Sequence, residues 1–239
     1  MSTELLKNKT ICITGATGGL GQQLAYKCGQ LGAKLLLMGR NCKKLDTLIT
    51  ALHHKNINAQ GYCLDLTKQA DVISCGNQIL HEHDAVDVLI HAAGVFPIKP
   101  LMETSPCEYE AIMSVNVTSA FNLAKLFAPQ MRENNWGRIV NIGSSSAYNG
   151  SAETGAYCVS KHALLGLSRS LFLELKSDNV RVYSISPGSM QTAMGESDTR
   201  QDFSTFVTPE EVADYVIFCM SFDKELISEE IRLNRTTIR

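Results

Sequence analysis

The chain has 239 residues, of which 44% are hydrophobic and 19% charged, enough for one globular domain to bury most of its surface. A net charge of −2 gives no electrostatic reason to expect a nucleic acid or an anionic membrane as partner. The start of the chain lacks an apolar signal-peptide core, and no apolar run approaches the ~18 residues that a spanning helix needs. We therefore expect a single cytoplasmic domain, 1–239.

Apolar segments rich in β-formers alternate with amphipathic helical patterns. Strands are expected at 10–13, 34–38, 59–64, 86–92, 138–142, 180–186 and 230–233. Helices are expected at 19–31, 43–54, 68–82, 107–133, 157–176 and 209–220. This alternation predicts an α/β fold with a doubly wound parallel sheet, helices on both faces, and a ligand crevice beyond the carboxyl ends of the strands. The unpatterned stretch 189–208 is long enough to suggest a substrate lid.

The eight cysteines form no C-x-x-C pair and no Cys/His cluster. We therefore expect neither a zinc site nor a disulfide framework, and most of the thiols should be reduced and packed in the core. His81-Glu82-His83 offers two candidate metal ligands, but alternate residues near a helix end point apart. A solvated polar turn is the favoured interpretation, and no metal is predicted.

A glycine-rich turn directly follows the first strand. In the run 14–21, Thr-Gly-Ala-Thr-Gly-Gly-Leu-Gly, glycines at 15, 19 and 21 allow a sharp turn, close approach to a pyrophosphate and tight packing of the next helix. The amino end of that helix would offer N–H groups and a positive dipole end to phosphates. An ordinary glycine-rich turn is the alternative, but the strand, turn and helix context favours dinucleotide binding.

Tyr157 and Lys161 stand four residues apart, so they share one face of a helix. An ammonium beside the phenol can lower its pKa from the ordinary value of ~10. Ser144 lies thirteen residues before Tyr157 at the end of a strand and offers a hydroxyl to polarise a carbonyl. Ser145 and Ser146 compete for this role, but the offset favours Ser144. In a chain with seven tyrosines a Tyr–Lys pair is weak evidence by itself. The glycine turn is a second motif that favours the catalytic interpretation over a chance spacing.

Together these motifs resemble the short-chain dehydrogenase/reductase family over nearly the whole chain. The family pattern is also met at Asp65, 92–94 (Ala-Ala-Gly), Asn116 and 187–188 (Pro-Gly). The resemblance implies a Rossmann-type fold, reversible hydride transfer between NAD(P)(H) and a carbonyl or secondary alcohol, and a homotetramer or dimer. The chain departs from the family in two places. His91 replaces the usual Asn, and the segment 229–234 with a polar tail replaces the common Val-Asp-Gly-Gly-like ending.

The resemblance implies a catalytic set of four residues: Asn116, Ser144, Tyr157 and Lys161. Tyr157 would donate a proton in reduction, and its phenolate would accept one in oxidation, while Ser144 steadies the same substrate oxygen. Lys161 would lower the Tyr157 pKa and hold the nicotinamide ribose. Asn116 would bind a water that links Lys161 to solvent, although taken alone such a residue is more often a local hydrogen-bonding group.

The resemblance also implies the cofactor-binding residues Thr14, Gly15, Thr17, Gly19, Leu20, Gly21, Arg40, Asp65, Leu66, Ala92, Ala93, Gly94, Tyr157, Lys161, Pro187, Gly188 and Thr192. Arg40 ends the second strand region, where an acidic residue would select NAD. A guanidinium there suits a 2′-phosphate, so NADP(H) is favoured over NAD(H). Each role has an alternative: Arg40 could cap its strand or stack on adenine, Asp65 could cap a helix instead of binding adenine, and Thr192 could be a plain loop hydroxyl instead of holding the carboxamide.

The substrate pocket is expected between the segment 147–154, the lid and the residues Phe96, Pro97, Met190, Met194, Phe203 and Phe206. A small-molecule carbonyl or alcohol is favoured over a carrier-bound substrate, because Asn135 and Asp178 stand where carrier-dependent relatives tend to place arginines. A 3-oxoacyl-[acyl-carrier-protein] reductase is the first alternative function. A non-catalytic NADP-binding sensor or scaffold is the second, disfavoured by the intact catalytic set. A sugar-nucleotide epimerase or dehydratase would need a longer C-terminal domain.

Overall fold

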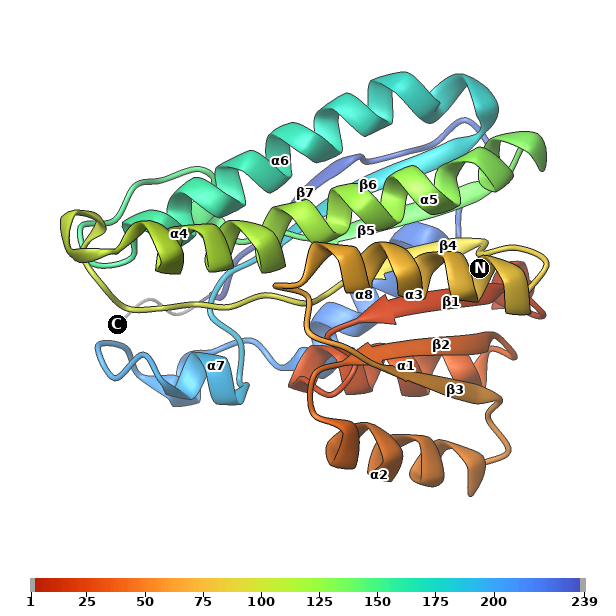
Figure 1. The fold of residues 1–239 in the computed structure, drawn as a ribbon, viewed down its shortest axis with the longest axis horizontal. Helices are drawn as coiled ribbons and strands as arrows, with labels where there is room; N and C mark the ends of the chain where they lie inside the picture. Colours follow the sequence, from red (N-terminus) through yellow and green to blue (C-terminus); the bar gives the residue numbers. More distant parts are fainter. Residues whose placement is uncertain (1–2, 237–239) are drawn as a thin grey trace.

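The computed structural model describes residues 3–236, and in this part of the chain seven parallel strands form one sheet in the order β3-β2-β1-β4-β5-β6-β7 (Figure 1). The strands are β1 (Thr10–Thr14), β2 (Lys34–Gly39), β3 (Ala59–Cys63), β4 (Val88–His91), β5 (Gly137–Ile142), β6 (Val180–Pro187) and β7 (Glu230–Leu233). The order of strand addition reverses at β1: β2 and β3 lie on one side of it, and β4 to β7 on the other. β1 and β4 pair along Ile11↔Val88 to Thr14↔His91. This switch point is where a doubly wound sheet opens its ligand crevice.

Helices cover both faces of the sheet. They are α1 (Gly19–Gln30), α2 (Cys42–His53), α3 (Gln69–Glu82), α4 (Pro106–Met113), α5 (Ser119–Glu133), α6 (Gly155–Leu175), α7 (Ala193–Glu196) and α8 (Pro209–Met220). One core packs α1, α2 and α8 on the sheet, and the other packs α3, α5 and the end of α6. Successive residues of a strand face opposite cores, as Ile11 and Ile13 do relative to Cys12. The sequence prediction of a doubly wound α/β fold is confirmed.

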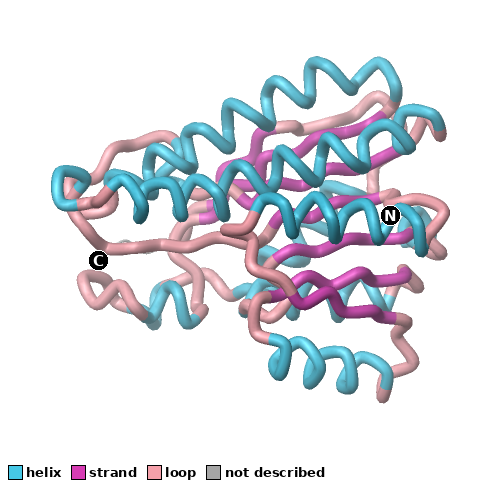
Figure 2. Tube along the Cα trace, in the orientation of Figure 1, coloured by secondary structure: helices cyan, strands magenta, loops and turns pink. Residues whose placement is uncertain are grey.

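Local sequence signals explain where several helices begin. Thr208 caps α8 by accepting a hydrogen bond from the Glu211 N–H, the Glu211 carboxylate accepts one from the Thr208 N–H, and Pro209 occupies the first turn. Ser105 and Glu108 form the same capping box at α4. The long loops gather at the end of the sheet where α4 and α7 lie, drawn pink in Figure 2. They include the stretch 189–208, which contains α7 and a short parallel bridge between Met190 and Val207.

The helix expected over 107–133 is instead interrupted. A π-helical turn, Ser114–Thr118, separates α4 from α5. Within this turn the buried Asn116 side chain bonds to the Val95 backbone, and such wide turns often occur at functional sites. By length and composition alone the stretch Pro106–Glu133 could also span a membrane, contrary to the sequence prediction. Half of its most apolar window is buried inside the domain, as in the core helices of α/β proteins.

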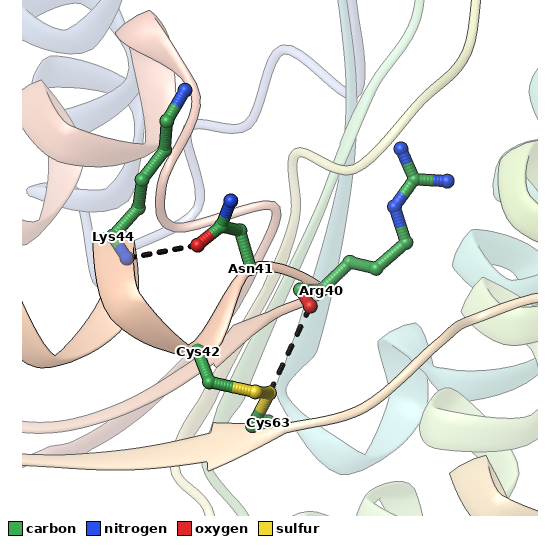
Figure 3. Close-up of a disulfide and its surroundings, with 5 residues drawn as sticks. All are labelled: Arg40, Asn41, Cys42, Lys44 and Cys63. Atoms are coloured by element: carbon green, nitrogen blue, oxygen red, sulfur yellow. Dashed lines mark hydrogen bonds between the residues drawn. A yellow bond between two sulfur atoms is a disulfide. The ribbon is translucent and has the colours of Figure 1, made fainter.

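A disulfide joins Cys42 to Cys63, so the expectation that the cysteines form no disulfide is wrong for this pair (Figure 3). The β2–β3 register pairs Gly39 with Cys63 and brings Cys63 beside the turn that starts α2 at Cys42, with the two Cα atoms 5.3 Å apart. The pairing is invisible in the sequence because 21 positions separate the partners. The other cysteines, at 12, 28, 75, 107, 158 and 219, are free.

Candidate active site

Two adjoining cavities open at the carboxyl ends of the strands. The glycine-turn cavity, of about 540 Å³, is lined by residues from the glycine turn, the ends of β2 and β3, and the segment 92–95. The tyrosine cavity, of about 300 Å³, is lined by Ser144, Tyr157, the start of the lid and Phe96. Met194 of α7 lines both. A long ligand can therefore lie across the two.

The glycine turn has the shape that its sequence predicts. Gly15 has φ +66°, and a Cβ there would lie 2.7 Å from the Ala93 Cα atom. A Cβ on Gly21 would lie 2.2 Å from the Gly15 carbonyl oxygen, so α1 can pack this closely only with glycine. No side chain caps the first turn of α1, so its N–H groups are available to an anion. Thr14 is fully buried and, like Gly19, Leu20 and Gly21, lines neither cavity.

The far end of the glycine-turn cavity is positively charged. Arg40 and Lys44 line it, and among residues 3–236 the Arg40 guanidinium has no hydrogen-bond partner. Figure 3 shows the Arg40 side chain extending away from the disulfide, whose Cys63 Sγ lies 3.8 Å from the Arg40 carbonyl oxygen. The sequence did not single out Lys44. A lysine in the first turn of the helix after β2 is the signal that could have found it.

Asp65 lines the same cavity but is engaged locally. Its Oδ1 accepts bonds from the Thr67 N–H at 3.0 Å and the Thr67 hydroxyl at 2.9 Å. These bonds, the backbone one foremost, and the charge of Arg40 lower the pKa of the Asp65 carboxyl. Asp65 therefore closes a turn on Thr67 and does not cap α3, whose N-cap residue is Lys68, and its second carboxylate oxygen is left for a ligand. Leu66, Ala92, Ala93 and Gly94 line the cavity as predicted.

Tyr157 and Ser144 face the tyrosine cavity from α6 and the end of β5. The Tyr157 ring packs edge-on against Phe96, with centroids 4.7 Å apart. Ser144 Oγ also accepts a hydrogen bond from the Ser146 N–H at 3.1 Å, which fixes the Ser144 side chain in the turn that follows β5. Ser145 and Ser146 line the cavity too, so proximity alone does not separate the three serines.

The Tyr157 pKa differs from the sequence prediction. Burial raises the pKa of Tyr157 to about 12, although the Ser144 hydroxyl acts in the opposite direction. Lys161 Nζ lies 5.7 Å from the centre of the Tyr157 ring and donates to the Ile142 carbonyl oxygen at 2.8 Å. Burial lowers the pKa of Lys161 to about 8. The Tyr157 pKa is therefore raised, contrary to the sequence prediction, because desolvation dominates and Lys161 is not among the groups that shift it.

Asn116 joins the π-helical turn to α6 and to the loop after β4. Its Oδ1 accepts from the Val95 N–H at 2.8 Å, and its Nδ2 donates to the Val95 carbonyl at 3.1 Å and to Ser160 Oγ at 2.9 Å. Ser160 in turn donates to the Tyr157 carbonyl at 2.7 Å. Gly94 lies close to both Asn116 Oδ1 and Lys161 Nζ. Sequence reasoning missed Ser160, a buried serine on the face of α6 that carries Tyr157.

His91 ties β1 to β4, so the tethering function survives the replacement of Asn. Thr14 Oγ1 accepts the Ala93 N–H at 3.2 Å and lies 2.9 Å from His91 Nδ1. This contact between Thr14 and His91 Nδ1 joins the last residue of β1 to the last residue of β4. Burial, then the charge of Lys161, lowers the pKa of His91 to about 3 and keeps the ring neutral.

The lid carries polar groups that the sequence prediction did not include. Met190, Met194 and Phe206 line the tyrosine cavity as expected, together with Pro187, Gly188 and Thr192. Thr192 also caps α7 by accepting from the Gly195 N–H at 3.1 Å. Asp198, Arg200 and Gln201 complete the wall. Neither Phe203 nor Pro97 lines it: Phe203 packs on Phe206 with centroids 5.4 Å apart, and Pro97 lines a separate hollow with Arg40.

The positions that were expected to disfavour a carrier lie elsewhere. Asn135 precedes β5 and Asp178 precedes β6, so both stand at the amino ends of the strands, opposite the cavities. Asp178 pairs with Arg132, with Nε 2.6 Å from Oδ2. Neither residue lines the tyrosine cavity, so within one protomer these two positions give no reason to disfavour a carrier-bound substrate.

The sheet order, the glycine turn at the switch point and the Tyr–Lys helix define a nucleotide-binding oxidoreductase fold. Residues 9–202 match the family model described as short chain dehydrogenase. The chain belongs to the short-chain dehydrogenase/reductase family. It is therefore an NAD(P)(H)-dependent oxidoreductase that transfers a hydride between nicotinamide and a carbonyl or hydroxyl group.

Individual relatives extend over the whole fold. The chain is 28% identical to a 3-oxoacyl-[acyl-carrier-protein] reductase of Aquifex aeolicus (strain VF5), over 96% of this chain and 97% of the relative. A metagenomic short-chain oxidoreductase in complex with NADP superposes with a TM-score of 0.86 at 30% identity, covering 98% of this chain and all of that one. An NAD+-bound xylitol dehydrogenase superposes with a TM-score of 0.86 at 25% identity, covering 96% and 98%.

Proposed function

We propose that this chain is an NADP(H)-preferring carbonyl reductase of small molecules, reversible as an alcohol dehydrogenase, with Asn116, Ser144, Tyr157 and Lys161 as its catalytic residues. The observation that carries the proposal is that Tyr157 and Ser144 face one cavity, which shares the lining residue Met194 with the glycine-turn cavity. When bound, the nicotinamide supplies or accepts the hydride.

Tyr157 and Ser144 act on the same substrate oxygen. With a pKa of about 12 the buried phenol stays protonated at neutral pH, which is the state a proton donor needs in the reducing direction. Ser144 donates its hydroxyl proton to the developing alkoxide, while its oxygen stays held by the Ser146 N–H. Phe96, packed on the Tyr157 ring, excludes water from the phenol.

Lys161 and Asn116 support this proton transfer through their contacts with the backbone, the cofactor and a water. Lys161 Nζ keeps one proton on the Ile142 carbonyl, which leaves two N–H groups for the cofactor ribose or a water. Asn116 holds the loop at Val95 and, through Ser160, the backbone of Tyr157. A water between Asn116 and Lys161, which both border Gly94, would complete a route for protons to solvent.

The test is Tyr157→Phe, which removes one hydroxyl and keeps the ring. Turnover should fall by about 10²–10⁴-fold, the usual contribution of a general acid, while the dissociation constant for NADPH changes little. The assay follows the loss of reduced-nicotinamide absorbance with a panel of ketones, 3-oxo esters and oxo acids. Turnover that survives the substitution would contradict the proton-donor role. Cofactor binding without turnover in the unaltered protein would favour the sensor or scaffold.

The preference for NADP(H) rests on charge at the end of β2. Gly39 leaves no carboxylate there to repel a 2′-phosphate, and the guanidinium of Arg40 is free to bind one with Lys44 nearby. Arg40→Asp should weaken NADPH binding by at least roughly tenfold and NADH binding far less, since a charged hydrogen bond is lost and a repulsion is gained. Titration with both cofactors measures this, and an unchanged ratio of affinities would contradict the 2′-phosphate role.

Reduction of 3-oxoacyl groups on acyl carrier protein remains the second candidate, supported by the similarity to the Aquifex aeolicus reductase. A tyrosine cavity of about 300 Å³ favours a short substrate. Comparison of kcat/KM for a short oxo acid, its ester and a carrier-bound thioester separates the two functions.

We also propose a homotetramer or dimer that uses α5 and α6. Phe121 and Leu173 are exposed on these helices, at 45% and 63%, and a hollow lined by residues of both helices lies beside them. Sedimentation analysis of the unaltered protein and of Leu173→Glu tests this interface.

A further inference from the structure

A cluster of three charged residues stands over the tyrosine cavity. Asp198 and Arg200 belong to the lid, and Glu153 belongs to the facing segment before α6. Asp198 and Arg200 line the cavity, whereas Glu153 does not. The Asp198 side chain is only 6% exposed, against 58% for Glu153, so the two carboxylates have very different surroundings.

Asp198 fixes the orientation of Arg200. Its Oδ1 accepts from Arg200 Nε at 2.6 Å and its Oδ2 from Nη2 at 2.9 Å, a bidentate pair that sets the plane of the guanidinium. Gln201 Nε2 also donates to Oδ2 at 2.9 Å. This buried arrangement leaves Arg200 Nη1 pointing away from Asp198.

Arg200 Nη1 donates to the exposed Glu153 carboxylate. Exposed ion pairs contribute only about 0–1 kcal/mol, so this contact exchanges readily. A ligand carboxylate in the cavity could take the place of Glu153 on Nη1 without changing the net charge around the guanidinium. The cavity volume of about 300 Å³ limits such a ligand to a few carbon atoms.

We infer that Arg200 determines substrate specificity by binding the carboxylate of a small hydroxy or oxo acid, and that Glu153 occupies the Arg200 Nη1 position until the acid enters. This inference rests on the proposed function, because the acid must present its carbonyl or hydroxyl carbon to Tyr157 in the same cavity. Ser151, Thr154 and Ser189 line the same cavity.

The inference predicts opposite effects for two substitutions. Arg200→Gln should raise KM for a short oxo acid at least roughly tenfold more than KM for its methyl ester, as expected for loss of a charged hydrogen bond. Glu153→Gln should lower KM for the acid, by roughly threefold, because it removes a competitor that contributes less than 1 kcal/mol. The ester, which has no carboxylate, should gain nothing from Glu153→Gln.

Arg235→Gln is the matched control for loosening of the lid. Arg235 holds the lid from the C-terminal side through Gln201 Oε1 at 2.6 Å and Thr205 Oγ1 at 2.9 Å, and it does not line the cavity. The Arg235→Gln substitution should change KM for the acid and KM for the ester by the same factor. If Arg200→Gln behaves like Arg235→Gln, or if Glu153→Gln does not lower KM for the acid, Arg200 is a lid anchor and the inference is overturned.

A binding measurement keeps the inference separate from the proposed function. Calorimetric titration of the NADP-saturated protein with butyrate and with butyramide requires no turnover. Butyrate should bind more tightly than butyramide, and Arg200→Gln should abolish the difference. If no carbonyl compound is turned over yet this preference is found, the proposed function fails and the carboxylate site stands. Equal binding of the two compounds would overturn the site, whatever the turnover.

Discussion

The Cys42–Cys63 disulfide ties the edge strand β3 to the start of α2, so breaking it should lower the stability of the domain. Both sulfur atoms lie at exposed positions, and no other covalent link holds this edge within residues 3–236. The bond closes a loop across 21 sequence positions. The chain-entropy relation gives about 3 kcal/mol for a loop of this size, mainly by restricting the unfolded chain.

The perturbation is the double variant Cys42→Ser/Cys63→Ser, which removes the bond and leaves no unpaired thiol at the site. Its free energy of unfolding should be about 3 kcal/mol lower than that of the oxidised protein, equivalent to a fall in Tm of roughly 6–12 °C for a domain of this size. Urea unfolding with and without a phosphine reductant measures the difference. Cys107→Ser, at an exposed free cysteine, is the control and should behave as the unaltered protein.

The same bond should affect cofactor binding. Cys63 immediately precedes the cavity residues Leu64, Asp65 and Leu66, and Cys42 follows Arg40 and Asn41. Freeing even one residue of backbone that must be ordered again costs about 1 kcal/mol, so NADPH should bind roughly fivefold more weakly to the double variant. For the stability prediction, identical urea midpoints for the oxidised protein and the double variant, with unchanged slopes, would refute the chain-entropy argument.

Two further predictions concern buried titratable groups. His91 has a native pKa of about 3, below the ~6.5 of an unfolded histidine, so unfolding takes up a proton and stability should fall as pH drops from 6.5 towards 3. Between pH 7 and pH 5 the loss should be about 2 kcal/mol, and His91→Asn should flatten it; an equal slope in urea titrations of both proteins would contradict this. Lys161, with a pKa of about 8, should lose its proton above that pH, so kcat/KM for reduction should decline there by about tenfold per pH unit. The Lys161→Arg variant should show no such decline. A decline of kcat/KM that persists in this variant would point to another titrating group.

Much of the fold was predictable because its signals are local. The alternation of apolar runs and amphipathic patterns identified all seven strands, and the helical pattern expected over 209–220 coincides with α8. The glycine turn was predictable for the same reason, because its conformation depends on residues within one βα unit. Chain order alone also placed Tyr157 and Ser144 at one end of the sheet.

The features that were missed depend on distant parts of the chain. The π-helical turn carries Asn116, whose partners Val95 and Ser160 lie 21 and 44 positions away in sequence. The Tyr157 pKa depends on how deeply the phenol is buried, which no spacing reveals. Arg200 meets Glu153 only when the lid lies on the opposite wall, 47 positions away in sequence. Such contacts come from tertiary packing, so a single sequence carries no direct signal for them.

The short helix α7 has a consequence for the order of events in a catalytic cycle. Ala193 and Met194 face the glycine-turn cavity, and Met194 also faces the tyrosine cavity. Occupancy of the first cavity should therefore hold α7 in the position that completes the second, and by reciprocity bound substrate should raise the equilibrium affinity for the cofactor. Initial-rate patterns should then show compulsory-order kinetics, with the nucleotide binding first and leaving last.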